Sequence, residues 1–221
     1  MPHNLIIRGF DDDIHSQLGD LSRQKGVSIN SIVKDAVDKW LKQQKEIPKR
    51  HHLLIYDNDE SLKHMLRSID KLAKEGEWFR CFVKSSNSTI TDVMKKLEWF
   101  DGTIVPYKPC SSQTDAMKQI YDILQNIAKN SDNKVICLMD FLINDIADFS
   151  VKQACYLERE YDKNRLEGLV ICSYHIDNLF KASTSEIIEM LKLHDQVFIL
   201  NDDQIYKLQI TKENLHKLFL S

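Results

Sequence analysis

The sequence predicts an α/β protein in two parts: a small strand–helix–helix unit, then a three-layer α/β domain with a mostly parallel sheet. After residue 51, short and almost wholly apolar segments alternate with longer helical patterns; Val135–Met139 and Leu169–Cys172 are two of these segments. Such runs are typical of strands covered on both faces, and their alternation with helices indicates parallel pairing. The first 44 residues instead show one strand pattern followed by two helical ones.

The first unit begins with a strand over residues 3–10. Successive side chains of a strand point to opposite faces, so Leu5 and Ile7 share one face, and the other face carries Asn4, Ile6 and Arg8. Asp11 is the expected N-cap of a first helix that ends at Gly26. Ser28 is expected to cap a second helix over Ile29 to about Lys42. A lone strand cannot satisfy its own backbone groups, so we expect it to pair with another strand.

This order, with IIRGFDDDIHSQL leading into KGVSINSIVKDAVDKWL, resembles the ribbon-helix-helix DNA-binding family over residues 3–44. In that family, strands from two protomers form an antiparallel ribbon that enters the DNA major groove. The resemblance implies a homodimer that binds double-stranded DNA, with higher oligomers on DNA left open. By position, it assigns base contacts to Asn4, Ile6 and Arg8, and phosphate contacts to the helix start at Ser28, Asn30 and Ser31.

One departure from that family is Asp11, where many members have proline. The three acids Asp11–Asp13 suit a helix N-terminus but subtract from the positive field near DNA. A structural alternative is a small dimerisation unit whose strand pairs without contacting DNA.

Length and charge favour two domains with different partners. The 221 residues accommodate a first domain over 1–46, a polar linker over 47–50 and a larger domain over 51–221. Residues 1–50 hold nine Lys/Arg and seven Asp/Glu, whereas the remainder holds 21 and 26. Dimerisation would double the positive charge of the first part, which suits a polyanion.

The chain has features of a cytoplasmic protein with no membrane partner. No apolar run approaches the ~18–20 residues that span a bilayer, and no signal-peptide pattern opens the sequence. The five cysteines are scattered and form no C-x-x-C pair, which favours reduced thiols over disulfides or a zinc site: Cys81, Cys110, Cys137, Cys155 and Cys172. We therefore expect no metal and no cofactor.

The larger domain shows seven strand patterns and five helical ones. Strands are expected over His52–Tyr56, Trp78–Lys84, Gly102–Tyr107, Lys134–Asp140, Gly168–Tyr174, Gln196–Leu200 and Ile205–Ile210. Helices are expected over Glu60–Glu75, Thr89–Trp99, Ser112–Lys129, Ile146–Lys163 and Ser185–Leu193.

Nucleotide hydrolysis is not expected, although the topology resembles RecA/KaiC-like ATPases. A phosphate loop after the first strand needs glycines and a lysine, whereas Tyr56–Leu62 has neither and carries three acids. The chain has only six glycines, and none forms a G-x-x-x-x-G-K-[ST] motif elsewhere. Asp140, at the end of a strand, resembles the metal-side acid of that fold. No Ser-His-Asp, Cys-His or spaced metal-ligand set emerges either, so we expect no enzymatic activity.

Three further segments resemble the MEDS sensory domain, which is named from methanogen and methylotroph regulators. They are HHLLIYDNDESLKHML with KEGEWFRCFV, YLEREYDKNRLEGLVICSYHIDNL, and EIIEMLKLHDQVFIL. Their short motifs are H-x4-Y, G-E, C-x-Y and a late histidine. In this chain an aspartate follows that histidine, whereas the family usually has proline there. The resemblance implies a KaiC-like fold without its phosphate loop that senses a small molecule or signal. The candidate ligand residues are His51, Tyr56, Glu77, Asp140, Tyr174 and His194.

Each of these candidates has a structural alternative. The histidines can be hydrogen-bonded structure, the tyrosines can pack at a strand end, and Cys172 can be plain core. Two functions stay open. One is a transcription regulator whose operator affinity is set by the α/β domain. The other is a DNA-binding scaffold or antitoxin-like protein whose α/β domain binds another protein.

Overall fold

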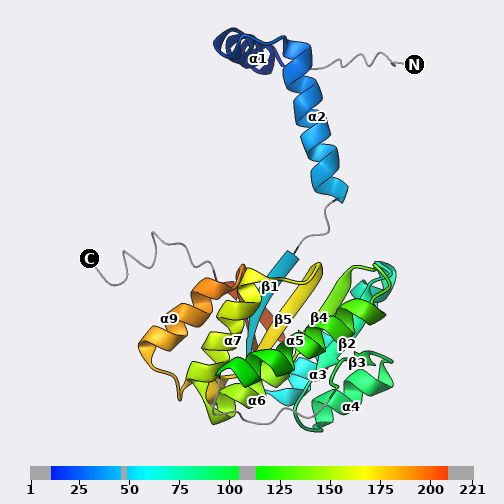
Figure 1. Ribbon diagram of the computed structural model, residues 1–221, viewed down its shortest axis with the longest axis vertical. Helices are drawn as coiled ribbons and strands as arrows, with labels where there is room; N and C mark the ends of the chain where they lie inside the picture. The colour runs from blue at the N-terminus through cyan, green and yellow to red at the C-terminus, as the bar shows by residue number, and fades with distance from the viewer. Residues whose placement is uncertain (1–10, 46–48, 105–112, 209–221) are drawn as a thin grey trace. The chain divides into compact units, whose positions relative to one another are not determined.

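A computed structural model describes residues 11–45, 49–104 and 113–208. The chain divides into two compact units, Met1–Ile47 and Pro48–Ser221 (Figure 1). The strand expected over residues 3–10, with its three candidate base-contacting side chains, lies outside the described residues.

The first unit contains the two expected helices, α1 (Asp12–Lys25) and α2 (Ile29–Lys45). Asp11 stands at the N-cap of α1 without a side-chain capping bond, and Gly26 ends the helix at φ +65°, a conformation that glycine adopts without strain. The Ser28 hydroxyl accepts a hydrogen bond from the Ser31 N–H (3.1 Å), which caps α2 as predicted. No residue of α1 is buried.

The second unit is built on a seven-stranded sheet in the order β3-β2-β4-β5-β1-β6-β7 (Figure 1). All neighbours pair in parallel except β6 and β7, which are antiparallel, so the expected α/β class with a mostly parallel sheet is confirmed. The strands are β1 (Lys49–Tyr56), β2 (Phe79–Val83), β3 (Phe100–Asp101), β4 (Ile136–Asp140), β5 (Gly168–His175), β6 (Gln196–Asn201) and β7 (Gln204–Leu208).

Helices cover both faces of this sheet, and the alternation of β1 shows how. Leu53 and Ile55 join an apolar cluster with residues of α5, α6, α7 and α9, whereas Leu54 and Tyr56 join a second cluster with residues of α3 and α4. Burying each such leucine contributes about 1.5–3 kcal/mol. The helices are α3 (Asp59–Glu75), α4 (Thr89–Lys96), α5 (Gln113–Asn130), α6 (Leu142–Phe149), α7 (Val151–Lys163), α8 (Ile176–Leu179) and α9 (Thr184–Leu193).

Several boundaries differ from the sequence prediction, three of them by more than a shift of a few residues at one end. The single helix expected over Ile146–Lys163 is two helices, because Ser150 adopts an extended conformation and its hydroxyl caps α7 by accepting the Gln153 N–H (3.3 Å). Of the strand expected over Gly102–Tyr107, residues 102–104 are not in a strand and the rest lies outside the described residues; the strand found here is the two-residue β3 just before it. The expected linker 47–50 is shorter, because residues 49 and 50 already pair with β5.

Gly168 lies where the backbones of two neighbouring strands approach closely. Its φ is +135°, and a Cβ atom there would lie 2.0 Å from the Ile136 carbonyl oxygen of β4. Only glycine can start β5 at this point.

Two expectations about thiols and membranes can be compared with the described residues. Cys81, Cys137, Cys155 and Cys172 are buried free thiols. Among the described helices, none has the length and apolar character needed to cross a membrane.

Candidate functional site

A buried carboxylate, Glu158 of α7, is the centre of a polar cluster on one face of the sheet. The His51 Nε2 atom lies 2.9 Å from its Oε2 oxygen, and the Tyr174 hydroxyl donates to its Oε1 oxygen at 3.0 Å. The Cys172 thiol lies 3.5 Å from Oε2, and the His194 Nε2 atom lies 3.5 Å from Oε1. All five side chains are at most 7 % exposed, so the cluster is shielded from solvent.

Four elements bring these groups together. His51 comes from the beginning of β1, and Cys172 and Tyr174 come from the neighbouring β5, two residues apart and therefore on the same face. Glu158 comes from α7, and His194 is the residue that ends α9.

Asp195, which follows His194, fixes the start of β1. Its N–H donates to the His51 carbonyl oxygen (2.7 Å), and its carboxylate accepts the His51 N–H (2.8 Å). Arg165 holds the same carboxylate at 2.7 Å. Proline has no N–H, so aspartate supplies a strand-to-loop contact that proline could not.

The charges in the cluster depend on each other. Burial raises the pKa of Glu158, but the positive charges of His194 and His51 outweigh burial and hold that pKa well below its usual range. Burial lowers the pKa of His194, and the Glu158 carboxylate outweighs this and raises it. Burial, together with the Glu158 charge, raises the pKa of Cys172 well above its usual value. The carboxylate is therefore the ionised centre that the other groups face.

A cavity of about 30 Å³ adjoins the cluster between the sheet, α5 and α7. Asp140, Glu158, Cys172 and Tyr161 supply its polar lining. A volume of this size matches one water-sized group rather than a metabolite.

Asp140 ends β4 beside this cavity. Its Oδ1 oxygen accepts the Ile143 N–H (3.0 Å) at the start of α6. Burial and then the Glu158 charge raise the pKa of Asp140 to about 7. Two acids thus face one cavity with pKa values moved in opposite directions, a pattern that is frequent at functional sites.

The structure brings together some of the sequence-derived candidates and separates others. His51, Tyr174 and His194 surround Glu158, and Asp140 lines the adjoining cavity. Tyr56 lies on the opposite face of the sheet, in the cluster with α3 and α4. Glu77 is exposed in the turn between α3 and β2. The six candidates therefore do not form one site: the cluster lies beneath α7 and α9, away from Tyr56 and Glu77.

Glu158 and Tyr161 were not among the sequence-derived candidates. Glu158 occupies a helical position whose neighbours on the same stripe, Ala154, Leu157 and Tyr161, are all buried. A charged residue on an apolar stripe is the signal that identifies it. The sequence also showed no spaced ligand set, because the group assembles across the fold: His51 and Cys172 are 121 residues apart.

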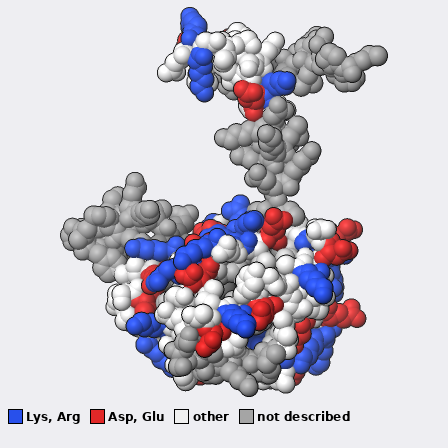
Figure 2. Space-filling view, in the orientation of Figure 1, with Lys and Arg blue, Asp and Glu red and all other residues white. Residues whose placement is uncertain are grey.

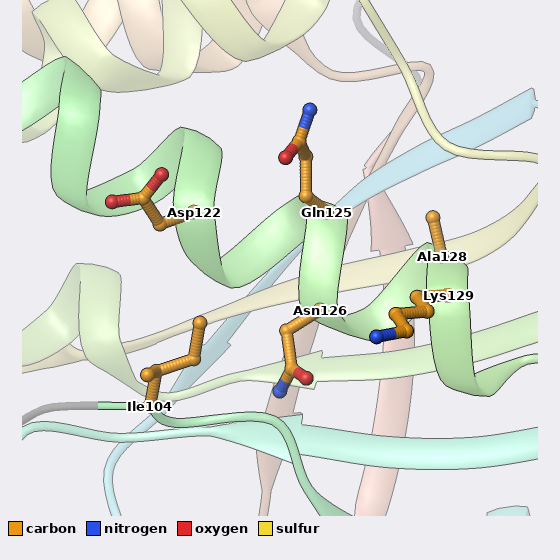
Figure 3. A pocket seen from close by; sticks show the side chains of 6 residues that line it. All are labelled: Ile104, Asp122, Gln125, Asn126, Ala128 and Lys129. Carbon is orange, nitrogen blue, oxygen red and sulfur yellow. The ribbon is translucent and has the colours of Figure 1, made fainter.

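A wider, open hollow of about 690 Å³ runs along α5. It is lined by Ile104, Asp122, Gln125, Asn126, Ala128 and Lys129 (Figure 3). Figure 3 shows Gln125 and Asn126 pointing in opposite directions from the helix, and the Asn126 amide donates to the Gly102 carbonyl oxygen (3.2 Å). The polar groups that line this hollow do not converge on one point as those around Glu158 do. We therefore place the candidate site at the Glu158 cluster.

Comparisons with known proteins give a fold likeness at most. No protein-family model matches the chain, and no curated protein matches it either. The solved structures that resemble this chain include one from Pyrococcus horikoshii OT3, described as a structural study of project PH0250, with 14% sequence identity and a TM-score of 0.48. That match covers 76% of this chain and 90% of the other.

Proposed function

We propose that the chain is a cytoplasmic, sequence-specific DNA-binding transcription regulator, in which the first unit binds double-stranded DNA as a homodimer. The α/β unit then senses a small molecule or signal. The observation that carries this proposal is the separate first unit with its pair of helices, α1 and α2, joined by a tight turn at Gly26. These helices follow the sequence segment that the ribbon-helix-helix resemblance assigns to the DNA-contacting strand.

Exposed apolar side chains on this unit support dimerisation. Ile14, Leu21, Val27 and Val37 are each 37–43% exposed in the single chain. A second copy would cover this surface and would also supply the antiparallel partner for the strand that the sequence predicts at residues 3–10. The exposed face therefore fits a homodimer of the ribbon-helix-helix type.

The start of α2 supports a phosphate contact. The Ser28 hydroxyl takes up the Ser31 N–H, and the first helical N–H groups before Ser31 have no intrahelical acceptor. Such groups bind phosphate oxygens. On the α/β unit, Lys/Arg and Asp/Glu side chains intermingle over the face seen in Figure 2, which fits DNA contact by the first unit.

Selection of genomic fragments tests this function. The full-length chain and Arg8→Ala are each mixed with fragments, and the bound DNA is sequenced. The parent should enrich a site, and Arg8→Ala should bind it about 5–150-fold less tightly, the effect of losing ~1–3 kcal/mol per base contact. Arg23→Ala is the control, because Arg23 is exposed on α1 and pairs with Asp20. Equal binding by the parent and Arg8→Ala would contradict base reading by this strand.

A sensory role requires that the signal favours one arrangement of the DNA-binding units. Its differential affinity for the two states sets the response, typically ~1–3 kcal/mol or about 5–150-fold in operator affinity. Gel-shift titration with fractionated metabolites measures this response.

One observation favours the alternative in which the α/β unit docks another protein. Phe149 and Phe180 are 67% and 77% exposed. The ion pair between their neighbours Asp148 and Lys181 (2.5 Å) brings these rings to the same part of the surface. Exposed aromatic side chains are typical of interfaces. Two results together would favour this function. A protein partner should bind the parent but not the Phe149→Ser/Phe180→Ser double variant, and the operator affinity of the parent should be the same in all metabolite fractions.

A further inference from the structure

We propose that His51, Glu158, Cys172 and His194 form a buried site for one divalent transition-metal ion, and that this ion is zinc. Each residue offers one donor atom, and the four atoms all lie within 4.8 Å of one another. This inference goes beyond the proposed regulation and does not depend on DNA binding.

Two of the three donor distances among His51, Cys172 and Glu158 fit tetrahedral coordination. Zinc bonds of about 2.0–2.3 Å place neighbouring donors about 3.3–3.8 Å apart. His51 Nε2 lies 3.3 Å from Cys172 Sγ, and Cys172 Sγ lies 3.5 Å from Glu158 Oε2. His51 Nε2 is closer to Glu158 Oε2, at 2.9 Å. A small outward movement of one side chain would therefore open the centre of the group.

His194 is oriented as a metal ligand. Its Nδ1 atom lies 2.7 Å from the Met190 carbonyl oxygen. A carbonyl only accepts, so Nδ1 carries a proton and donates it. When the ring is neutral, as metal binding requires, Nε2 presents a lone pair, and this atom is buried and has no hydrogen-bond partner within the described parts of the chain. Metal-bound histidines usually donate their other N–H to such an acceptor.

The two facing acceptors call for a cation between them. The lone pair of His194 Nε2 faces Glu158 Oε1 at 3.5 Å. A proton or a metal ion is needed to make that contact favourable, since two acceptors otherwise repel. The orphaned nitrogen is therefore the observation that points to a ligand.

The surrounding groups orient the other donors. The Tyr174 hydroxyl donates to Glu158 Oε1 at 3.0 Å and leaves Oε2 directed at His51 and Cys172. The His51 ring packs against His194 and Tyr161, with ring centroids 4.1 Å and 4.8 Å apart. His51 Nδ1 finds no hydrogen-bond partner in the described structure, so ring packing holds this ligand.

The donor types select zinc. Two imidazoles, a thiolate and a carboxylate suit zinc, whereas magnesium and calcium prefer oxygen ligands. When zinc binds, the Cys172 thiol loses its proton to solvent as the Zn–S bond forms. The charges of the thiolate and of Glu158 then balance the ion. Four protein ligands fill the tetrahedron, as in sites that stabilise a fold rather than catalyse a reaction.

Metal analysis of the full-length chain tests this site. The protein is purified without chelator, analysed for metals, stripped, and titrated with Zn²⁺ and with Co²⁺. We expect one ion per chain, a rise in melting temperature on reloading with Zn²⁺, and a near-ultraviolet charge-transfer band from thiolate to Co²⁺. Absence of both stoichiometric binding and this band in the parent would overturn the proposal.

Variants locate the ion. Cys172→Ser should lose the Co²⁺ band, and Glu158→Gln should weaken metal affinity about 10-fold or more while the band remains. Cys137→Ser is the matched control, because Cys137 is a buried strand thiol that packs in the cluster on the opposite face. A band that survives Cys172→Ser, or that disappears in Cys137→Ser, would contradict the assignment. If Cys172→Ser does not fold, the Co²⁺ spectrum of the parent and the metal affinity of Glu158→Gln still decide whether the ion binds at this cluster.

Discussion

Replacing Asp140 by asparagine is expected to make the α/β unit more stable at alkaline pH. Burial and the Glu158 charge raise the pKa of Asp140 from 3.8 to about 7. The folded chain therefore binds a proton more tightly than the unfolded chain between these values. The free energy of unfolding then falls as the pH rises from about 4 to 7, and it stays lower above 7.

The magnitude follows from the size of the shift. About three pKa units correspond to at most ~4 kcal/mol. Asp140, unlike the rest of β4, keeps some exposure to solvent, which screens its charge, so we expect about 2 kcal/mol. Asparagine removes the charge and keeps an oxygen that can accept the Ile143 N–H, which the Asp140 carboxylate accepts at 3.0 Å. At pH 8 the variant should therefore unfold at a higher urea concentration than the parent.

Urea denaturation of metal-stripped protein at pH 5 and pH 8 measures this effect. Stripping ensures that no cation neutralises Glu158. Asp122→Asn is the control, because Asp122 is an exposed carboxylate on α5. If Asp140→Asn were less stable than the parent at pH 8, or if its advantage were the same at pH 5, the reasoning about burial and Glu158 would be refuted.

Three further substitutions test the fold. Burial raises the pKa of Asp70, but hydrogen bonds from three neighbours outweigh burial and lower that pKa. The stability that the ionised Asp70 contributes is therefore present above about pH 4 and lost below it. Asp70→Asn should cost about 2–4 kcal/mol in thermal denaturation at pH 7 and much less at pH 3. Gly168→Ala places a Cβ atom 2.0 Å from the Ile136 carbonyl oxygen, so circular dichroism should show a loss of folded protein; a native melting temperature would refute the close approach. Ser150→Ala removes the α7 cap and should cost about 1 kcal/mol in urea denaturation, whereas an unchanged midpoint would contradict a stabilising cap.

The sequence predicted most elements of the fold because local patterns encode them. The apolar run before Asp140 identified β4, and Gly26 identified the end of α1. The break at Ser150 escaped prediction, because the apolar periodicity continues through it and a serine caps a helix only when the backbone there is extended.

The candidate site was only partly visible in the sequence. His51, Tyr174 and His194 were marked by short motifs, but their common partner Glu158 lies in a helix of ordinary composition. Parallel pairing of β1 with β5 and the packing of α7 over them create the cluster. Strand and helix periodicity predicts which side chains of one element share a face. It does not predict which face of another element they will contact in the assembled fold.

The binding ratio between a selected DNA fragment and its shuffled sequence tests the proposed function most directly. Fluorescence anisotropy with the full-length chain at fixed salt gives both dissociation constants. We expect about 10³-fold or greater preference for the selected fragment, and weaker binding of both sequences as salt rises. Equal affinity for the two sequences would contradict a sequence-specific regulator.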